Sequence, residues 1–265
     1  MRIGNTLDHL KEQKEKGLII YITAGDPSLE ATEELVVALA EARADVVELG
    51  IPFSDPLADG VTIQQATQRA LKNKVNIPKI LTSIKRIRER TSVPLALMGY
   101  YNPMYHYGLK SLVGDSKKAG VDGFIVPDLP FEEAEVFGEI TARAGLELIS
   151  FLAPTSTRER IAAITQKARG FIYCISVTGV TGIREEFSPK VGESLKIIRN
   201  YTNLPLAIGF GISTPAQARE AAKYADAVIV GSAVVHLIEE AEGDLAKMIP
   251  EVSRFVRSLK EAITE

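Results

Sequence analysis

Short apolar runs recur along the chain, and each consists of strand-forming residues with few polar interruptions. Runs that are apolar nearly throughout, without polar alternation, are typical of strands buried on both faces of a parallel sheet. The pattern predicts strands at Leu18–Ile22, Asp45–Leu49, Pro94–Met98, Gly123–Val126, Glu147–Leu152, Phe171–Ser176, Pro205–Ile208 and Ala227–Val230.

The segments between these runs have helical spacing and begin with helix-start signals. Ser28 precedes one such segment, and Ser156 and Thr157 precede another. Thr214 opens a third segment with Pro215 behind it, at the first helical position where proline is well tolerated. Glycine can adopt the left-handed conformation that often ends a helix. We expect three helices to end in this way, at Gly120, Gly145 and Gly170.

The chain has about 33 residues per predicted strand, which is the size of one βα repeat. Equal units without a linker favour an α/β fold of one domain over residues 1–265, a closed TIM (β/α)8 barrel. We expect a helix at Asn5–Lys16 to cap the bottom of the barrel. The stretch after Gly231 should form an extra helix after strand eight and a final helix, divided near Gly243. An open doubly wound sheet is disfavoured, because the first strand is followed by Ala24-Gly25-Asp26-Pro27 and not by G-x-G-x-x-G.

Composition narrows the class of protein. The formal net charge of −3 gives no basic footprint for nucleic acid or for an anionic membrane. The single cysteine, Cys174, excludes an intramolecular disulfide framework, and we expect it to be buried in the core. The first residues are too polar for a signal peptide, and no apolar stretch reaches the ~20 residues of a membrane span. We therefore expect a cytoplasmic protein, without a metal site because its histidines lack ligand spacing.

Two carboxylates lie where a TIM barrel builds its active site, at the C-terminal ends of the strands. Glu48 falls between Val47 and Leu49 in the second run, so side-chain alternation should direct it into the barrel mouth. Burial there would raise its pKa and let it donate a proton near neutral pH, although a structural ion pair is the alternative. Asp59 ends the loop after the same strand, and its alternative role is helix capping.

Glycine-bearing turns follow the last three predicted strands, at Thr178–Gly182, Gly209–Ser213 and Gly231–Ser232. Glycines let backbone N–H groups approach an anion, and a helix start adds its positive end, so these turns predict a phosphate site. The long loop Val177–Ser188 suggests a lid, with a disordered surface excursion as the alternative. Tyrosines at strand ends suggest an apolar pocket, formed by Tyr21, Tyr100 and Tyr173.

One segment is highly specific. The run Glu48–Gly60, with its exposed Phe53 and with Thr62-Ile63-Gln64 behind it, closely resembles the signature of the tryptophan synthase alpha subunit family. Further motifs match the family in order along the chain: Thr23-Ala24-Gly25-Asp26-Pro27, Tyr101-Asn102-Pro103, Asp128-Leu129-Pro130, Gly179-Val180-Thr181-Gly182, Gly209-Phe210-Gly211-Ile212 and Gly231-Ser232-Ala233. The resemblance implies a TIM-barrel lyase that cleaves indole-3-glycerol phosphate to indole and glyceraldehyde 3-phosphate by a retro-aldol reaction.

The same resemblance assigns roles to residues. It implies that Glu48 is the general acid–base at indole C3 and that Asp59 accepts the indole N–H. Positions that match the family's substrate contacts are Tyr21, Ile63, Tyr100, Ile125, Tyr173 and Thr181. Positions that match its phosphate donors are Gly182, Gly211, Gly231 and Ser232. The chain departs from the family at Val61, where many relatives have proline, and at Ser176-Val177-Thr178, where Ser-Arg is common.

The resemblance also implies a partner. Alpha subunits dock onto a beta subunit that carries pyridoxal phosphate, in an alpha2-beta2 heterotetramer, so we expect no cofactor in this chain. Loops that correspond to the contact surface contain Pro52, Phe53, Asp55 and Asn102. Alternative readings are a free-standing lyase that releases indole, a non-catalytic activating subunit, and a sugar-phosphate isomerase of the same barrel type.

Overall fold

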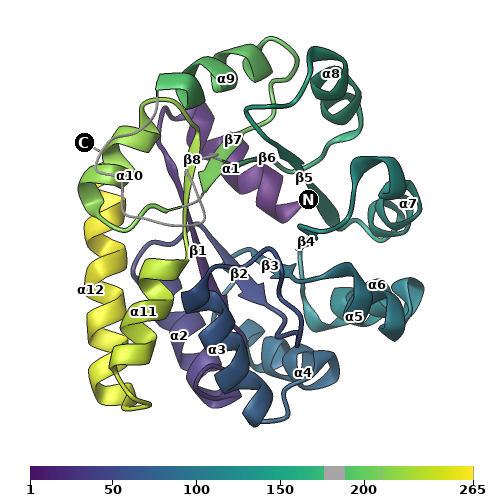
Figure 1. The fold of residues 1–265 in the computed structure, drawn as a ribbon. Helices are drawn as coiled ribbons and strands as arrows, with labels where there is room; N and C mark the ends of the chain where they lie inside the picture. Colours follow the sequence, from purple (N-terminus) through teal and green to yellow (C-terminus); the bar gives the residue numbers. More distant parts are fainter. Residues whose placement is uncertain (176–188, 210, 265) are drawn as a thin grey trace.

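The computed structural model describes residues 1–175, 189–209 and 211–264. Its eight strands are parallel and close into a barrel in sequence order, with helices around them (Figure 1). The strands are β1 (Gly17–Thr23), β2 (Val46–Gly50), β3 (Leu95–Met98), β4 (Gly123–Ile125), β5 (Glu147–Leu152), β6 (Ile172–Ile175), β7 (Leu206–Gly209) and β8 (Ala227–Val230). The predicted TIM barrel is confirmed, and each strand boundary lies within one residue of its prediction.

Helices follow the strands, and among the described residues three segments carry two α-helices each, namely those after β2, β3 and β8. The helices are α1 (Arg2–Glu12), α2 (Leu29–Glu41), α3 (Val61–Lys72), α4 (Ile77–Arg88), α5 (Tyr101–Tyr107), α6 (Leu109–Ala119), the 3-10 helix η1 (Phe131–Glu133), α7 (Glu135–Arg143), α8 (Arg158–Lys167), α9 (Pro189–Arg199), α10 (Pro215–Ala222), α11 (Ser232–Glu240) and α12 (Leu245–Thr264). Helices α3, α5 and α11 are thus additions to the one-helix-per-strand plan. The extra helix after β8 is confirmed, whereas α4 and α5 were missed.

The predicted helix starts are confirmed by their side-chain caps. Ser28, Thr157 and Thr214 each accept a hydrogen bond from the backbone N–H three residues on, at 3.1, 3.3 and 3.2 Å. Each bond satisfies one of the backbone donors that a helix start leaves without an intrahelical partner. Such caps are local features, which is why the sequence predicts them well.

Two of the three predicted glycine caps are confirmed. Gly120 takes the left-handed conformation at the end of α6, and Gly145 does so after α7. The prediction for Gly170 is wrong, because α8 ends at Lys167 and the next residue is extended. Gly170 instead lies in the turn before β6, where an added Cβ would approach the Ile149 side chain to 2.8 Å.

The N-terminal helix closes the bottom of the barrel, as predicted, but it spans Arg2–Glu12 and not Asn5–Lys16. Its end is set by Lys14, whose positive φ of 61° turns the chain toward β1. Ile3 and Leu7 are fully buried and pack with the residues that fill the barrel. Figure 1 shows α1 lying across the ring of strands.

Alternation along the strands produces two separate apolar cores. Side chains that point inward, such as Ile19, Val46 and Phe171, fill the barrel together with the α1 residues. Their neighbours point outward and pack under the helices, as Val47 and Leu49 do. This is the arrangement expected of strands buried on both faces.

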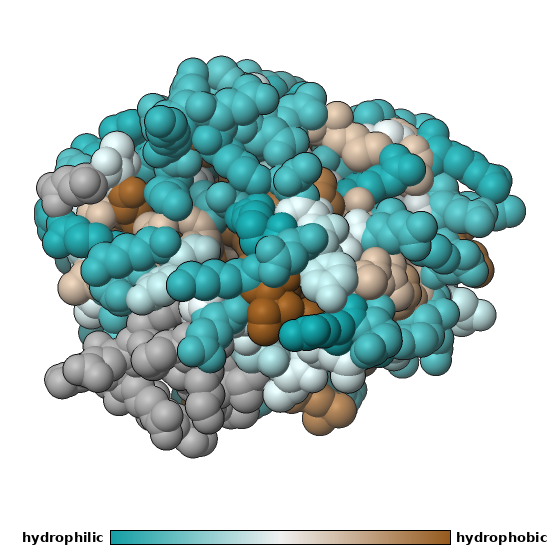
Figure 2. Space-filling view, turned by 90° about the horizontal axis from the view of Figure 1, so that it is seen from above, coloured by the Kyte–Doolittle hydropathy of each residue, from teal (hydrophilic) through white to brown (hydrophobic). Residues whose placement is uncertain are grey.

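The outer surface is mostly polar. Hydrophilic residues cover most of the face seen in Figure 2, and apolar residues gather only in small areas of it. No helix in the described part of the chain is long and apolar enough to cross a membrane.

Candidate active site

Glu48 points into the barrel. Its neighbours Val47 and Leu49 belong to the outer core, whereas Val46, two positions earlier, belongs to the inner one. In the sheet, Glu48 pairs with Tyr21 of β1 on one side and with Ala96 of β3 on the other. The alternation inferred from sequence therefore predicts its direction correctly.

The Glu48 carboxylate is fully buried and has no hydrogen-bond partner for either oxygen among the described residues. Burial alone raises its pKa from 4.5 to about 8. No described cation pairs with it, so the alternative of a structural ion pair is not supported. A carboxyl group in this state can release and recover a proton near neutral pH.

Asp59 lies in the loop between β2 and α3. Gly60 occupies the N-cap position of α3 and no side chain caps this helix, so Asp59 is not a capping residue. Burial raises its pKa to about 6, and hydrogen bonding with Tyr100 acts in the opposite direction. The hydroxyl of Tyr100 also accepts a hydrogen bond from the Ala58 N–H at 2.8 Å, so this tyrosine holds the loop that carries Asp59.

A cavity of about 160 Å³ opens at the C-terminal end of the barrel and joins the two carboxylates. The predicted residues that line it are Tyr21, Glu48, Asp59, Ile63, Tyr173, Gly211, Gly231 and Ser232. Tyr100 and Ile125 are buried nearby but do not line this cavity; Ile125 belongs to the inner core. Thr181 and Gly182 lie outside the described residues, as do the other residues of the predicted lid, Val177–Ser188.

Two tyrosines stand beside Glu48, and each has its hydroxyl over a glycine. A Cβ added to Gly50 would lie 2.1 Å from the hydroxyl oxygen of Tyr21, and one added to Gly209 would lie 2.8 Å from that of Tyr173. The Tyr21 hydroxyl is 3.3 Å from the Thr23 hydroxyl. The two glycines thus make the space into which the tyrosines of the pocket extend.

The part of the cavity lined by Gly211, Gly231 and Ser232 is suited to an anion. Gly211 has a φ of 82° and open space around its α carbon. Gly231 is the N-cap of α11 and Ser232 its first residue, and no side chain caps this helix start. The N–H groups of the first turn of α11 thus lack a side-chain acceptor and, with the positive end of the helix, favour a bound phosphate.

Some residues that line the cavity were missed by the sequence analysis, above all Met98 and Ile229. Each lies two positions after a residue of the inner core, Ala96 or Ala227, so strand alternation could have found both. Ala58, Gly60, Ile212, Ser213 and Ala233 complete the lining. Ile212 and Ser213 belong to the turn Gly209–Ser213 that the sequence indicates as part of a phosphate site.

The predicted partner-contact residues differ in exposure. Asp55 and Asn102 are exposed, whereas Pro52 is buried. Phe53 was expected to be exposed but is partly buried, because its ring packs against Tyr100 with 5.5 Å between ring centroids.

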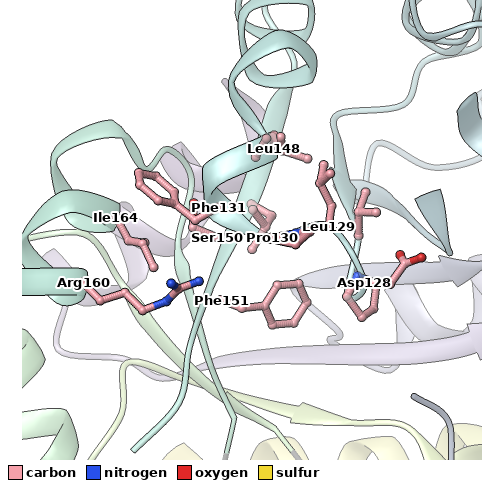
Figure 3. A pocket seen from close by; sticks show the side chains of 13 residues that line it. Asp128, Leu129, Pro130, Phe131, Leu148, Ser150, Phe151, Arg160 and Ile164 are labelled. Atoms are coloured by element: carbon pink, nitrogen blue, oxygen red, sulfur yellow. The ribbon is translucent and has the colours of Figure 1, made fainter. Parts of the chain in front are cut away.

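A second cavity, of about 240 Å³, lies between the segment after β4, strand β5 and helix α8 (Figure 3). Its charged groups are engaged in the fold: Asp128 accepts the Tyr101 N–H at 2.8 Å, and Arg160 pairs with Glu132 at 2.5 Å. This cavity contains neither Glu48 nor Asp59. Among the described residues, no group of three or more His, Cys, Asp or Glu side chains is placed to hold a metal ion.

Comparison with known proteins agrees with this geometry. The family model described as tryptophan synthase alpha chain matches residues 7–264. The tryptophan synthase alpha chain of Geotalea uraniireducens is 49% identical over 262 residues, which cover 99% of this chain and 97% of the relative. The tryptophan synthase alpha chain of Thermoanaerobacter sp. is 47% identical, and the match covers 99% of each chain. The crystal structure of tryptophan synthase subunit alpha from Legionella pneumophila has a TM-score of 0.91 at 38% identity and covers 99% of this chain and 98% of its own. The chain belongs to the tryptophan synthase alpha chain family.

Proposed function

We propose that this protein cleaves indole-3-glycerol phosphate to indole and glyceraldehyde 3-phosphate, as the alpha subunit of tryptophan synthase in tryptophan biosynthesis. The family is one of carbon–carbon lyases that carry out this reaction. The observation that carries the proposal is the buried, unpartnered carboxylate of Glu48 in a cavity that it shares with Asp59 and with the start of α11.

Proton transfer explains why the reaction needs two carboxylates. The acid form of Glu48 gives its proton to C3 of the indole ring, and Asp59 accepts the ring N–H as positive charge develops there. The resulting Glu48 carboxylate takes the proton of the glycerol hydroxyl next to the ring. The carbon–carbon bond then breaks, its electron pair returns to the ring, and the hydroxyl carbon becomes the aldehyde. A Glu48 pKa of about 8 suits both directions of this transfer.

The rest of the cavity binds the substrate. Tyr21, Ile63 and Tyr173 give the apolar surface for the indole ring. The glycerol phosphate extends toward Gly211, Gly231 and Ser232, where backbone N–H groups supply the hydrogen bonds. Such charge-assisted bonds contribute about 1.5–3 kcal/mol each, so a phosphate can be held without lysine or arginine. We include Tyr100, Ile125, Thr181 and Gly182 among the substrate contacts on the family resemblance alone.

The test is the rate of indole release from indole-3-glycerol phosphate. We expect Glu48→Gln to lower kcat by at least ~10²-fold while substrate still binds, because the amide cannot transfer the proton. Glu147→Gln is the matched control: Glu147 is also a buried carboxyl with a raised pKa, but it lies at the opposite end of the barrel and should be dispensable for catalysis. Indole release by Glu48→Gln near the wild-type rate would refute the assignment.

We further propose that the chain acts with a beta subunit that holds pyridoxal phosphate, in an alpha2-beta2 heterotetramer. The assembly would be located in the cytoplasm. Residues 1–265 would form one domain, which has no cofactor of its own. The contact surface would include Pro52, Phe53, Asp55 and Asn102. Family membership supports the partner, and so does the exposure of Leu57, which is 93% accessible beside these residues. Assays of indole release with and without a beta subunit separate this proposal from a free-standing lyase.

A further inference from the structure

Two parts of the lining of the candidate active site are carried by two helices that the standard barrel lacks. Asp59 and Gly60 lead directly into α3, and Ser232 is the first residue of α11. Both helices begin at the cavity, because all three residues line it. They pack against each other beside β1, as Figure 1 shows.

The contact between α3 and α11 is small and separate from the two main cores. It consists of Ile63, Ala66 and Val235, with Tyr21 of β1 packed against them. These side chains lie within the first two turns of each helix. This apolar contact joins the beginnings of the two helices, which also pack on β1, and a second direct attachment between α3 and α11 lies further along them.

That second attachment is Arg69. Its guanidinium binds both carboxylate oxygens of Asp26 at 2.8 Å and donates another hydrogen bond to Glu239 of α11 at 2.6 Å. Arg69 is eight residues into α3 and Glu239 seven residues into α11. A rise of 1.5 Å per residue places both at a similar depth, about 10–12 Å from the helix starts at the cavity.

Asp26 is itself fixed to the barrel wall. It is 2% exposed and lies in the turn after β1, where Thr32 accepts the Gly25 N–H at 2.9 Å. Asn73, just after α3, donates to the Pro27 carbonyl of the same turn. Arg69 therefore ties α3 and α11 to each other and to a rigid part of the barrel.

We propose that Arg69 is a positioning residue that sets the spacing between Asp59 and the phosphate-binding start of α11, and thereby selects a substrate whose aromatic ring and phosphate are separated by a fixed length of chain. This inference rests on the proposed function. The planar fork of arginine is required, because one side chain must bind a carboxylate with two nitrogens and reach a second carboxylate with the third.

If Arg69 sets this spacing, a ligand that joins an indole ring to a phosphate should respond to a change at Arg69 more strongly than the two halves, indole and glycerol 3-phosphate, do separately. A ligand with two binding groups gains affinity over its parts only if both groups engage at once, so that gain depends on the spacing of the two subsites. Indole alone and glycerol 3-phosphate alone each use one subsite and are insensitive to the spacing. Indole joined to phosphate by a three-carbon chain without hydroxyl groups cannot be cleaved and uses both.

The experiment measures binding of these three ligands by calorimetry, and kcat and KM for indole-3-glycerol phosphate. The variants are Arg69→Lys, which keeps the charge but loses the fork, and Glu239→Gln, which removes the negative charge that Arg69 meets on α11 and leaves the Arg69–Asp26 pair in place. The control is Glu34→Gln, which breaks a similar two-nitrogen pair with Arg90, at 2.6 and 2.9 Å, between elements that do not line the cavity.

We expect Arg69→Lys to weaken binding of the joined ligand about tenfold and to lower kcat, while both halves bind within about twofold of wild type. Glu239→Gln should shift the same quantities in the same direction by less, and Glu34→Gln should leave all of them unchanged.

Unchanged binding of the joined ligand and unchanged kcat in both variants would overturn the proposal. The proposal would also be overturned if indole alone and glycerol 3-phosphate alone lost as much affinity as the joined ligand. A merely structural role of Arg69 would weaken binding of all three ligands alike. Because the Glu239 side chain is partly exposed, its variant decides the question if Arg69→Lys fails to fold. Failure of the wild-type protein itself to release indole would instead count against the proposed function.

Discussion

At the scale of single residues, burial separates two carboxylates into an acid and a base. Glu48 is fully buried without a partner, and the pKa of its carboxyl group rises to about 8. Asp59 is less buried and hydrogen-bonds with Tyr100, so its pKa rises only to about 6. Between these values Glu48 carries a proton and Asp59 is ionised, which is the pair of states that the proposed reaction uses.

This separation predicts a bell-shaped dependence of kcat/KM on pH. Activity should fall below about pH 6, as Asp59 takes up a proton, and above about pH 8, as Glu48 loses one. Measurement of kcat/KM for indole release across this range checks the shape. In Asp59→Asn the remaining activity should no longer fall on the acidic side; an unchanged acidic limb would assign that limb to another group.

The glycines beneath the two tyrosines give a second residue-scale prediction. Gly50→Ala should lower kcat/KM by about tenfold or more, because the new methyl group would occupy the position of the Tyr21 hydroxyl and displace a wall of the cavity. Gly114→Ala is the control, since nothing lies within 4 Å of its added carbon and Gly114 is in α6, outside the lining of the cavity. Steady-state kinetics of both variants decide the matter, and equal activities would contradict the role of Gly50.

At the scale of elements, prediction succeeded where the signal is local. An apolar run or a capping side chain such as Ser28 identifies a strand or a helix start from a few neighbouring residues. Gly170 was misread because its positive φ serves the packing of a turn against Ile149 and not the end of α8. Helices α4 and α5 were not predicted, because one helix was already assigned to each of the two segments that contain them.

Helix α6 contains a matched pair of glycines for which opposite effects are expected. Gly114 is inside the helix with open space around it, so Gly114→Ala should raise the free energy of unfolding by about 0.5–1 kcal/mol. Gly120 has a φ of 98° and lies against the Arg88 side chain, so Gly120→Ala should lower it by more than this. Chemical denaturation of the two variants measures both values. A destabilised Gly114→Ala would contradict the open space described around Gly114.

At the scale of the whole molecule, a second buried carboxyl group binds the N-terminal helix to the bottom of the barrel. Glu147, at the start of β5, accepts the Gly4 N–H of α1 at 3.0 Å. A carboxylate at the positive end of a helix is favourable, but burial outweighs this interaction and raises the pKa of Glu147 to about 7. A side chain at Gly4 would lie 2.8 Å from this carboxylate, so the close contact between α1 and β5 requires glycine.

A raised pKa in the folded state means that folding takes up a proton at intermediate pH. The contribution of Glu147 to stability is therefore complete below about pH 4.5 and is lost as the pH rises toward about 7. We expect the free energy of unfolding to fall over this range by an amount on the order of 2 kcal/mol more in wild type than in Glu147→Gln. Urea denaturation of both proteins at several pH values tests this, and parallel pH profiles would contradict it.

Features that depend on neighbouring residues can be predicted from the order of amino acids. Eight apolar runs specify the barrel, alternation turns Glu48 inward, and a continuous motif indicates the chemistry, because each of these signals lies within a few positions of the chain. The contacts between distant segments become visible only in the folded chain: Tyr100 holds the Asp59 loop, Glu147 accepts a hydrogen bond from α1, and Arg69 joins α3 to α11. These contacts join residues that are 42, 143 and 170 positions apart, and they depend on the closure of the barrel.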